Sequence, residues 1–362
     1  MRFLIFICGI ILGVSSQAST VTITAKYREA ANIFTIMDCA SGWWDKSFCY
    51  DDGQIQEEFK TRFGISDQDK TLFKKYDELR KKYYRGLGAP KEDTGPYSDG
   101  IFAKKSGIKE DLIAPAFYSS DKLDEALLKL KSVLSADDLD FLKSFYITFE
   151  PKYKTFLEES VPFKAAAAKL NKILSDKRFQ KFYAKILDYY SVSEDLNYVV
   201  LFTWFPPLDH DSASPSDQFL ILQKNPKKHI DWTDDDVVFH EIVHTVSARQ
   251  PLKQKEDISK VFLKYCPIEN KFGKYKNTKA LEEPMAVVIG QILFLKEFFP
   301  NRVRIDTKLY NDPWVSSFSK IIYPTIENDF KNNKKFSENT GEALGRLCEE
   351  SFKAAKIIMK EN

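Results

Sequence analysis

Apolar residues recur at helical spacing over much of the first half of the chain. Between residues 121 and 191, leucines and aromatic residues mark one face of each segment and charged residues fill the other, which predicts a series of packed helices. One helix is predicted at about 152–174, where Pro162 should kink or split it. The shorter elements expected before this series are a strand at 20–27 and helices at 29–37, 54–62 and 68–84.

The pattern changes at residue 197, where β-branched and aromatic residues replace the helical repeat. The runs Tyr198–Trp204 and Phe219–Gln223 predict a hairpin with a polar loop, whose outer strand could pair with an extended peptide. Two further helices are expected at 314–331 and 337–360. The predicted fold class is α+β and mostly helical, with a helical N-terminal region at 19–190 and a second domain with a small sheet at 191–362.

The stretch 233–247 contains the sequence His-Glu-x-x-His. On a helix, His240 and His244 lie on the same face, so both imidazoles can reach one metal ion. Glu241 lies beside that ion, where it can take a proton from a metal-bound water, as in zinc hydrolases. Thr233 as N-cap and the three aspartates after it favour a helix start there. The alternative, two ordinary histidines at this spacing by chance, is less expected in a chain with only four histidines.

A catalytic zinc ion takes a third protein ligand and keeps one position open. No histidine follows His244, so the third ligand is a downstream carboxylate or else His210 or His229. The downstream candidates are Glu282 and Glu283, two neighbouring acids in an otherwise apolar segment.

The segment 277–293 predicts a buried helix with Pro284 in its first turn, where a missing N–H costs little. Glu283 shares a face with Gly290, and small residues on that face would let the helix pack closely on another. We therefore expect Glu283 to be the ligand. Glu282 points about 100° away and could instead orient a ligand histidine. The alternative for both acids is a simple attraction to the helix dipole.

These two motifs together resemble those of the gluzincin zinc peptidases, of which thermolysin is the familiar member. The resemblance implies a zincin-like fold with an edge strand before the metal helix, with His240, His244 and Glu283 as zinc ligands and Glu241 as general base. The metzincin extension is absent, and Glu282 stands where thermolysin has Asn, so the subfamily and the substrate stay open. The resemblance says little about residues 19–190.

The expected function is zinc-dependent hydrolysis of peptide bonds in extracytoplasmic peptides or proteins. A further donor should stabilise the oxyanion, and the candidates are Tyr310, Tyr323, His210 and His229, of which we prefer Tyr323. The alternative function is an exported, zinc-binding module without hydrolytic activity, which binds a partner or a cell-wall component. Peptide cleavage that depends on Glu241 separates the two.

Charge and the N-terminus bear on partners and location. The formal net charge is +2 with no basic block, so we expect no nucleic-acid partner. Arg2 and the apolar run 3–14 predict a secretory signal peptide at 1–18, with cleavage after Ala18 and a secreted or periplasmic product. No later stretch is apolar enough for stable membrane insertion. The sequence leaves the oligomeric state open.

Four cysteines remain after the predicted cleavage, which suggests up to two disulfides in an exported protein. Cys39 and Cys49 are the natural local pair. Cys266 and Cys348 would then join the segment after the metal helix to the C-terminal helix. Four cysteines allow three pairings, and the sequence does not choose among them.

Overall fold

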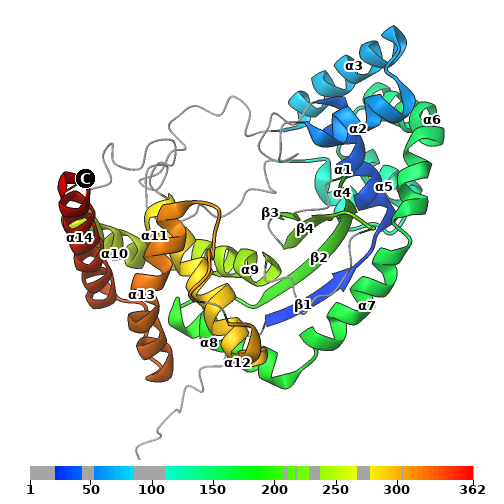
Figure 1. Ribbon diagram of the computed structural model, residues 1–362. Coiled ribbons are helices and arrows are strands. Elements are labelled where there is room, and N and C mark those ends of the chain that lie inside the picture. Colours follow the sequence, from blue (N-terminus) through cyan, green and yellow to red (C-terminus); the bar gives the residue numbers. More distant parts are fainter. Residues whose placement is uncertain are drawn as a thin grey trace, which may run out of the picture.

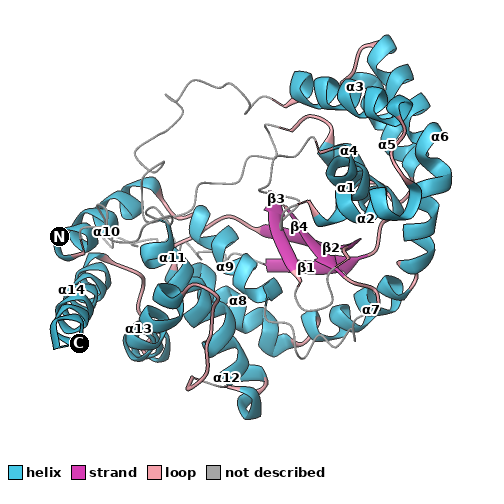
Figure 2. Cartoon of the chain, turned by 45° about the horizontal axis from the view of Figure 1, so that its top comes forward, coloured by secondary structure: helices cyan, strands magenta, loops and turns pink. Residues whose placement is uncertain are grey.

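The computed structural model describes residues 21–42, 53–84, 111–206, 211–216, 218–227, 237–266, 278–303 and 305–361. Helix accounts for 71% of the structure and strand for 9%, and the strands form one mixed sheet, so the α+β class is confirmed (Figures 1 and 2). The sequence predictions that fall outside the described residues concern the signal peptide at 1–18, Cys49, His210, His229 and the helix cap at Thr233.

The sheet has the strand order β1-β2-β4-β3. Its strands are β1 (Val21–Lys26), β2 (Leu196–Trp204), β3 (Ser212–Ser216) and β4 (Phe219–Lys224). Strands β1, β2 and β4 are parallel, with Val21 opposite Leu196 and Val199 opposite Phe219. Every residue of β4 and most of β2 are buried, as expected of parallel strands covered on both faces.

The predicted hairpin of Tyr198–Trp204 with Phe219–Gln223 is wrong, because these two runs pair in parallel. The hairpin partner of β4 is β3, which lies inside the segment that the sequence indicated as a polar loop. Its sequence, Ser-Ala-Ser-Pro-Ser, has no apolar alternation to mark a strand. Strand β3 is at the edge of the described sheet, where the proline is tolerated.

The helices before β2 surround one end and one face of the sheet (Figure 1). Their bounds are α1 (Glu29–Ser41), α2 (Gln54–Phe63), α3 (Asp67–Tyr83), α4 (Ala114–Tyr118), α5 (Leu123–Lys129), η2 (Leu130–Ser132), α6 (Ala136–Glu159), α7 (Pro162–Leu174) and α8 (Lys177–Tyr189). The helix predicted at 152–174 is in fact two, since α6 runs unbroken through Pro151 and Pro162 begins α7. Proline at a helix start loses no intrahelical hydrogen bond, which is why the chain breaks here.

A buried ionic cluster joins three N-terminal segments. The guanidinium of Arg80 on α3 is fully buried and makes bidentate contacts of 2.7–3.0 Å with Asp38 on α1 and with Asp111. Tyr76 donates to Asp38 at 2.5 Å, and Asp111 accepts the backbone N–H groups of Ile113 and Ala114. Burial raises the pKa of Asp38 to about 6 against the opposing effects of Arg80 and Tyr76.

The helices after β4 lie towards the other end of the sheet (Figure 1), where Phe179 of α8 packs against Phe239 and Phe294. Their bounds are α9 (Val237–Ala248), α10 (Leu252–Tyr265), α11 (Thr278–Ala286), η3 (Val287–Leu293), α12 (Phe294–Phe298), η4 (Pro300–Arg302), α13 (Pro313–Lys331) and α14 (Glu338–Glu361). Helices α13 and α14 confirm the two predicted C-terminal helices. Cys266 and Cys348 form a disulfide with a Cα–Cα distance of 5.6 Å, which is the second of the two predicted pairs.

The two predicted regions share a sheet and a hydrophobic core. Strand β1 precedes the N-terminal helices, yet it pairs with β2, on the other side of the predicted boundary at residue 190. Buried apolar residues from both sides of that boundary belong to one cluster. Across the part of the chain that the structure describes, no helix combines the length and the apolar character needed to span a membrane.

Candidate metal centre

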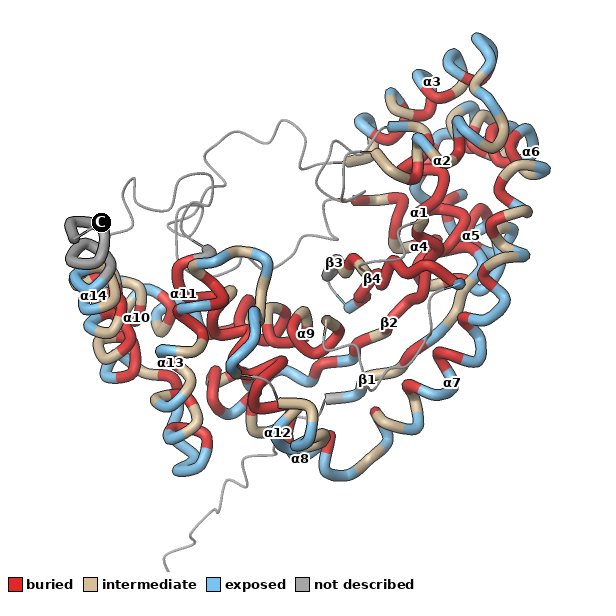
Figure 3. Tube along the Cα trace, viewed as in Figure 1, coloured by how far each residue is buried: buried red, intermediate tan, exposed pale blue. Residues whose placement is uncertain are grey.

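Helix α9 is almost entirely buried, and it lies beside the edge strand β3 (Figures 1 and 3). Its apolar residues face the core, and a hydrogen bond between the hydroxyls of Tyr198 on β2 and Thr245 fixes it to the sheet. At its C-terminal end, the ammonium group of buried Lys255 donates to the carbonyl of Ala248 at 2.6 Å. A cation at the C-terminal end of a helix also interacts favourably with the helix dipole. Contacts at both its C-terminal end and its sheet side thus fix the position of the helix.

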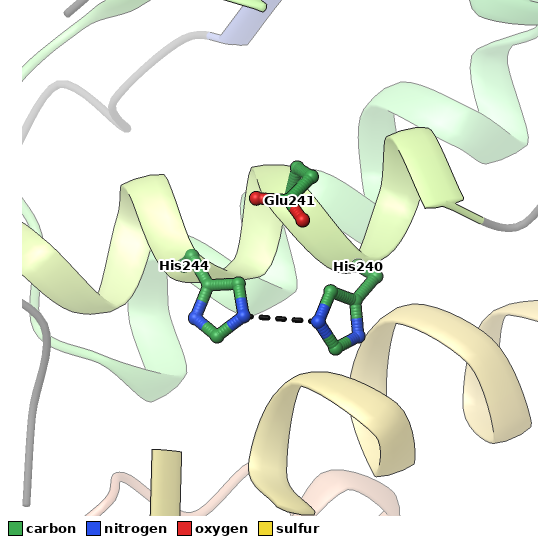
Figure 4. A group of neighbouring side chains, drawn as sticks. All are labelled: His240, Glu241 and His244. Carbon is green, nitrogen blue, oxygen red and sulfur yellow. Dashed lines mark hydrogen bonds between the residues drawn. The ribbon is translucent and has the colours of Figure 1, made fainter. Parts of the chain in front are cut away.

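His240 and His244 extend side by side from one face of α9 toward the neighbouring helical segment (Figure 4). Their Nε2 atoms are 3.0 Å apart, as the i, i+4 spacing requires for a shared ligand. His240 is 4% exposed, so solvent barely reaches its ring. Glu241 contributes a carboxylate to the same group, in which all ligand atoms lie within 4.8 Å of one another.

Glu283 on α11 brings the third converging atom. Its Oε2 lies 3.3 Å from Nε2 of His240 and 3.6 Å from Nε2 of His244. Ligands of a tetrahedral zinc ion, bound at about 2.0–2.1 Å, are about 3.3 Å apart from one another. The three distances, 3.0, 3.3 and 3.6 Å, therefore describe the base of such a site. Two imidazoles and one carboxylate are also a donor set that suits zinc.

Glu282 contacts the other side of one imidazole. Its Oε1 lies 2.8 Å from Nδ1 of His244, and its side chain is 3% exposed. In a neutral His244 with its proton on Nδ1, this contact would leave the lone pair of Nε2 directed at the converging atoms. The structure thus places Glu282 where the sequence suggested, as the acid that orients a histidine.

The acids sit inside helix α11 and not at its start. The described helix begins at Thr278, so Pro284 lies in its interior, and the prediction that this proline occupies the first turn is wrong. Proline removes one intrahelical donor, and the helix then continues as the π-helical segment η3. Attraction to a helix N-terminus therefore does not explain Glu282 and Glu283. Their burial against two histidines calls for a different account.

Gly290 explains how η3 approaches α9 so closely. A Cβ atom at this position would lie 2.7 Å from Cα of His240 and 2.7 Å from the carbonyl oxygen of Phe239. Only a glycine allows such backbone contact without a shift of one helix. The sequence singled out Gly290 as part of a small-residue face, and the structure identifies what that face packs against.

The acids and imidazoles of the site shift one another's pKa. Burial raises the pKa of Glu241 to about 7, His244 opposes this change, and the charges of Glu283 and Glu282 add to it. Burial alone would lower the pKa of His244, but Glu283 and Glu282 outweigh burial and hold that pKa well above its usual range. The raised pKa of His244 shows that the acids favour positive charge between them, either as a proton on His244 or as a bound cation.

Tyr310 and Tyr323 occupy different places. The ring of Tyr310 stacks on that of His240, with centroids 5.7 Å apart and an interplanar angle of 21°. The hydroxyl of Tyr323 instead donates to Glu327 and accepts from Lys296, both at 2.9 Å. The structure does not bring Tyr323 to the metal-site residues, contrary to our preference among the four donors. Tyr310 lies in the loop before α13, and the path of that loop brings its ring to His240, whereas Tyr323 lies on α13 itself.

No family model, curated protein or solved structure matches this chain.

Proposed function

We propose that the chain is a zinc-dependent peptide hydrolase of the gluzincin type. The observation that supports this most is the convergence of His240 Nε2, His244 Nε2 and Glu283 Oε2 within 3.0–3.6 Å of one another. These residues would hold the metal through three protein ligands, which leaves one position open for a reactant. Zinc bound there would supply Lewis-acid polarisation of a carbonyl group and of a water molecule.

Glu241 is the general base of the proposed reaction. Its carboxylate lies in the same group of ligand atoms, one residue after the first histidine. It would take the proton of the attacking water and deliver it to the leaving amine nitrogen.

Tyr310 replaces Tyr323 as the proposed oxyanion donor. Its ring stacks on that of His240, beside the proposed metal site. A phenol there would donate a hydrogen bond to the negative charge that develops on the carbonyl oxygen.

Strand β3 offers a place for the substrate backbone. It is the edge strand of the sheet and α9 lies beside it. An extended peptide could add to this edge by backbone hydrogen bonds and so pass the metal centre. An edge strand before the metal helix is what the gluzincin resemblance implies for a zincin-like domain at 191–362. The signal-like segment at 1–18 supports export, and hence extracytoplasmic peptides as substrates.

The test compares the wild-type chain from Ser19 with Glu241→Gln, by elemental analysis for zinc and by cleavage of unfolded casein and a mixed peptide pool. We expect about one zinc per chain in both proteins and at least a 100-fold loss of cleavage in the variant. Tyr310→Phe should lower kcat about 100-fold with little change in KM, and Tyr323→Phe is its matched control.

Other outcomes separate the alternatives. One zinc in both proteins without cleavage in either would favour the non-hydrolytic zinc-binding module. Absence of zinc after supply of the metal would exclude His240 and His244 as ligands. Equal activity of the wild type and Glu241→Gln would remove the proposed base.

A further inference from the structure

A pocket of about 450 Å³ lies between α8, the end of η3 with α12, and α13. Three buried apolar side chains line it: Phe182, Leu293 and Phe330. The volume falls within the range of pockets that bind small molecules. None of the proposed metal-site residues lines this pocket, so its chemistry is independent of the metal centre.

Cations outnumber acids around this pocket. Its acidic side chains are Glu297 and Glu327, and its cationic side chains are Arg178, Lys181, Lys185, Lys296 and Lys331. Glu327 is already engaged, because it forms ion pairs with Lys296 and, at 3.2 Å, with Lys331. Arg178 pairs with Asp176 at 2.7 Å. These ion pairs do not involve Lys181 or Lys185.

Lys181 and Lys185 are one helical turn apart on α8 and face the same pocket. Within the described parts of the chain, neither has an ion pair with a carboxylate, and the ammonium of Lys185 lies 5.7 Å from the ring centroid of Phe330. Like charges at i, i+4 on a helix destabilise it. An anion bound between the two ammonium groups would remove that repulsion.

We propose that this pocket binds an amphiphilic anion. The anionic group, a carboxylate or phosphate, would lie on Lys181 and Lys185, and the apolar part would cover Phe182, Leu293 and Phe330. A small polar anion would leave the apolar lining in water, and an uncharged apolar molecule would leave the two lysines unpaired. The combination of both surfaces in one pocket is the argument for a ligand with both characters.

The test is isothermal titration calorimetry of the full chain with sodium decanoate below its micelle concentration. Butanoate carries the charge without the apolar chain, and decyltrimethylammonium carries the chain with the opposite charge. We expect decanoate to bind with a Kd below about 1 mM and both comparison ligands at least about tenfold more weakly. The proposal would be overturned if the protein bound neither decanoate nor, in the flotation assay described below, vesicles that contain phosphatidylglycerol. Equal affinity for decanoate and butanoate would also overturn it.

The double variant Lys181→Glu/Lys185→Glu should weaken decanoate binding at least about tenfold. The matched control is Lys260→Glu/Lys264→Glu on α10, which makes the same change of charge at the same spacing and should leave the affinity within about twofold. Circular dichroism would verify that both variants fold. Equal weakening in both variants would show a general effect of charge and would overturn the site.

The same anionic chemistry can come from a free molecule or from a lipid headgroup. Flotation with phosphatidylcholine vesicles, with and without phosphatidylglycerol, separates these sources. Binding to soluble decanoate supports a free ligand. Binding to phosphatidylglycerol vesicles alone, lost in Lys181→Glu/Lys185→Glu and kept in the α10 control, would support the same pocket with a bilayer lipid as its ligand.

Discussion

The molecule contains two buried clusters of charged groups, and they are completed in different ways. In the N-terminal helices, Asp38 and Asp111 share the guanidinium of Arg80, so the chain supplies its own cation. At the metal centre, Glu282 and Glu283 face two imidazoles, which carry a full positive charge only when protonated. The first cluster holds a permanent cation, whereas the second depends on a proton at His244 or, as we propose, on a metal ion in its place.

Removal of the internal cation gives the largest expected effect. Arg80→Met leaves two buried carboxylates without a cation and should lower the free energy of unfolding by about 3–5 kcal/mol, measured by urea denaturation. Arg62→Met is the control, because Arg62 pairs with Glu58 and Glu159 near the surface and should cost about 1 kcal/mol or less. Similar losses in both variants would contradict the distinction between a complete buried cluster and a surface pair.

Addition of the external cation should have the next largest effect. Zinc at about a hundredfold excess over its Kd should raise the free energy of unfolding of the metal-free protein by about 2.7 kcal/mol. Glu283→Gln should reduce this gain at the same zinc concentration, and magnesium should give little gain because it prefers oxygen ligands. A protein whose unfolding is insensitive to zinc would contradict the comparison at the metal centre.

The acid that orients His244 should matter less than a direct ligand. Glu282→Gln keeps the size of the side chain and removes its charge, so zinc affinity should fall about 10–100-fold, measured by competition with a chelator. Glu256→Gln, an exposed acid on α10, is the control and should leave the affinity unchanged. An unchanged affinity in Glu282→Gln would show that the contact with His244 does not support metal binding.

The smallest expected effect is a pH dependence of the complete cluster. The pKa of Asp38 in the folded protein, about 6, is above its usual value, so its contribution to stability is present at low pH and is lost as the pH rises through about 6. Asp38→Asn should remove roughly 1–2 kcal/mol of this change between about pH 4.5 and 6.5. Urea denaturation of the wild type and of Asp38→Asn over this pH range measures the difference. Any contribution of the candidate metal centre is the same in both proteins and cancels in that difference. Parallel pH profiles would contradict the raised pKa.

Local patterns predicted most of the helices, including α9 with its His-Glu-x-x-His motif, because helical spacing is a short-range property. The parallel pairing of β2 with β4 could not be predicted, since a buried apolar run does not specify the direction of its neighbour. Strand β3 lacks an apolar pattern, and its existence depends on the edge of β4.

The sequence likewise predicted part of the candidate site. Glu283 was chosen from its helical face, and the same reasoning assigned Glu282 to a histidine. The choice of Tyr323 over Tyr310 failed because it depends on how the segment before α13 folds back over His240, which no periodicity encodes. The π-helical turn of η3 likewise follows from the close contact at Gly290 and the interior proline, and not from helix propensity.

The parallel pairing of β1 with β2 has a consequence for synthesis. Residue 21 meets its partner only when residue 196 has been made, which at about 5–20 residues per second takes roughly 10–35 s. The helices between them can form during that interval, but the sheet that supports α9 cannot close. Strand β1, in which apolar and polar residues alternate, has both edges unpaired until then, and an unpaired strand is open to aggregation. The central sheet therefore forms late in translation. The candidate metal centre, whose helix α9 packs on that sheet, forms later still.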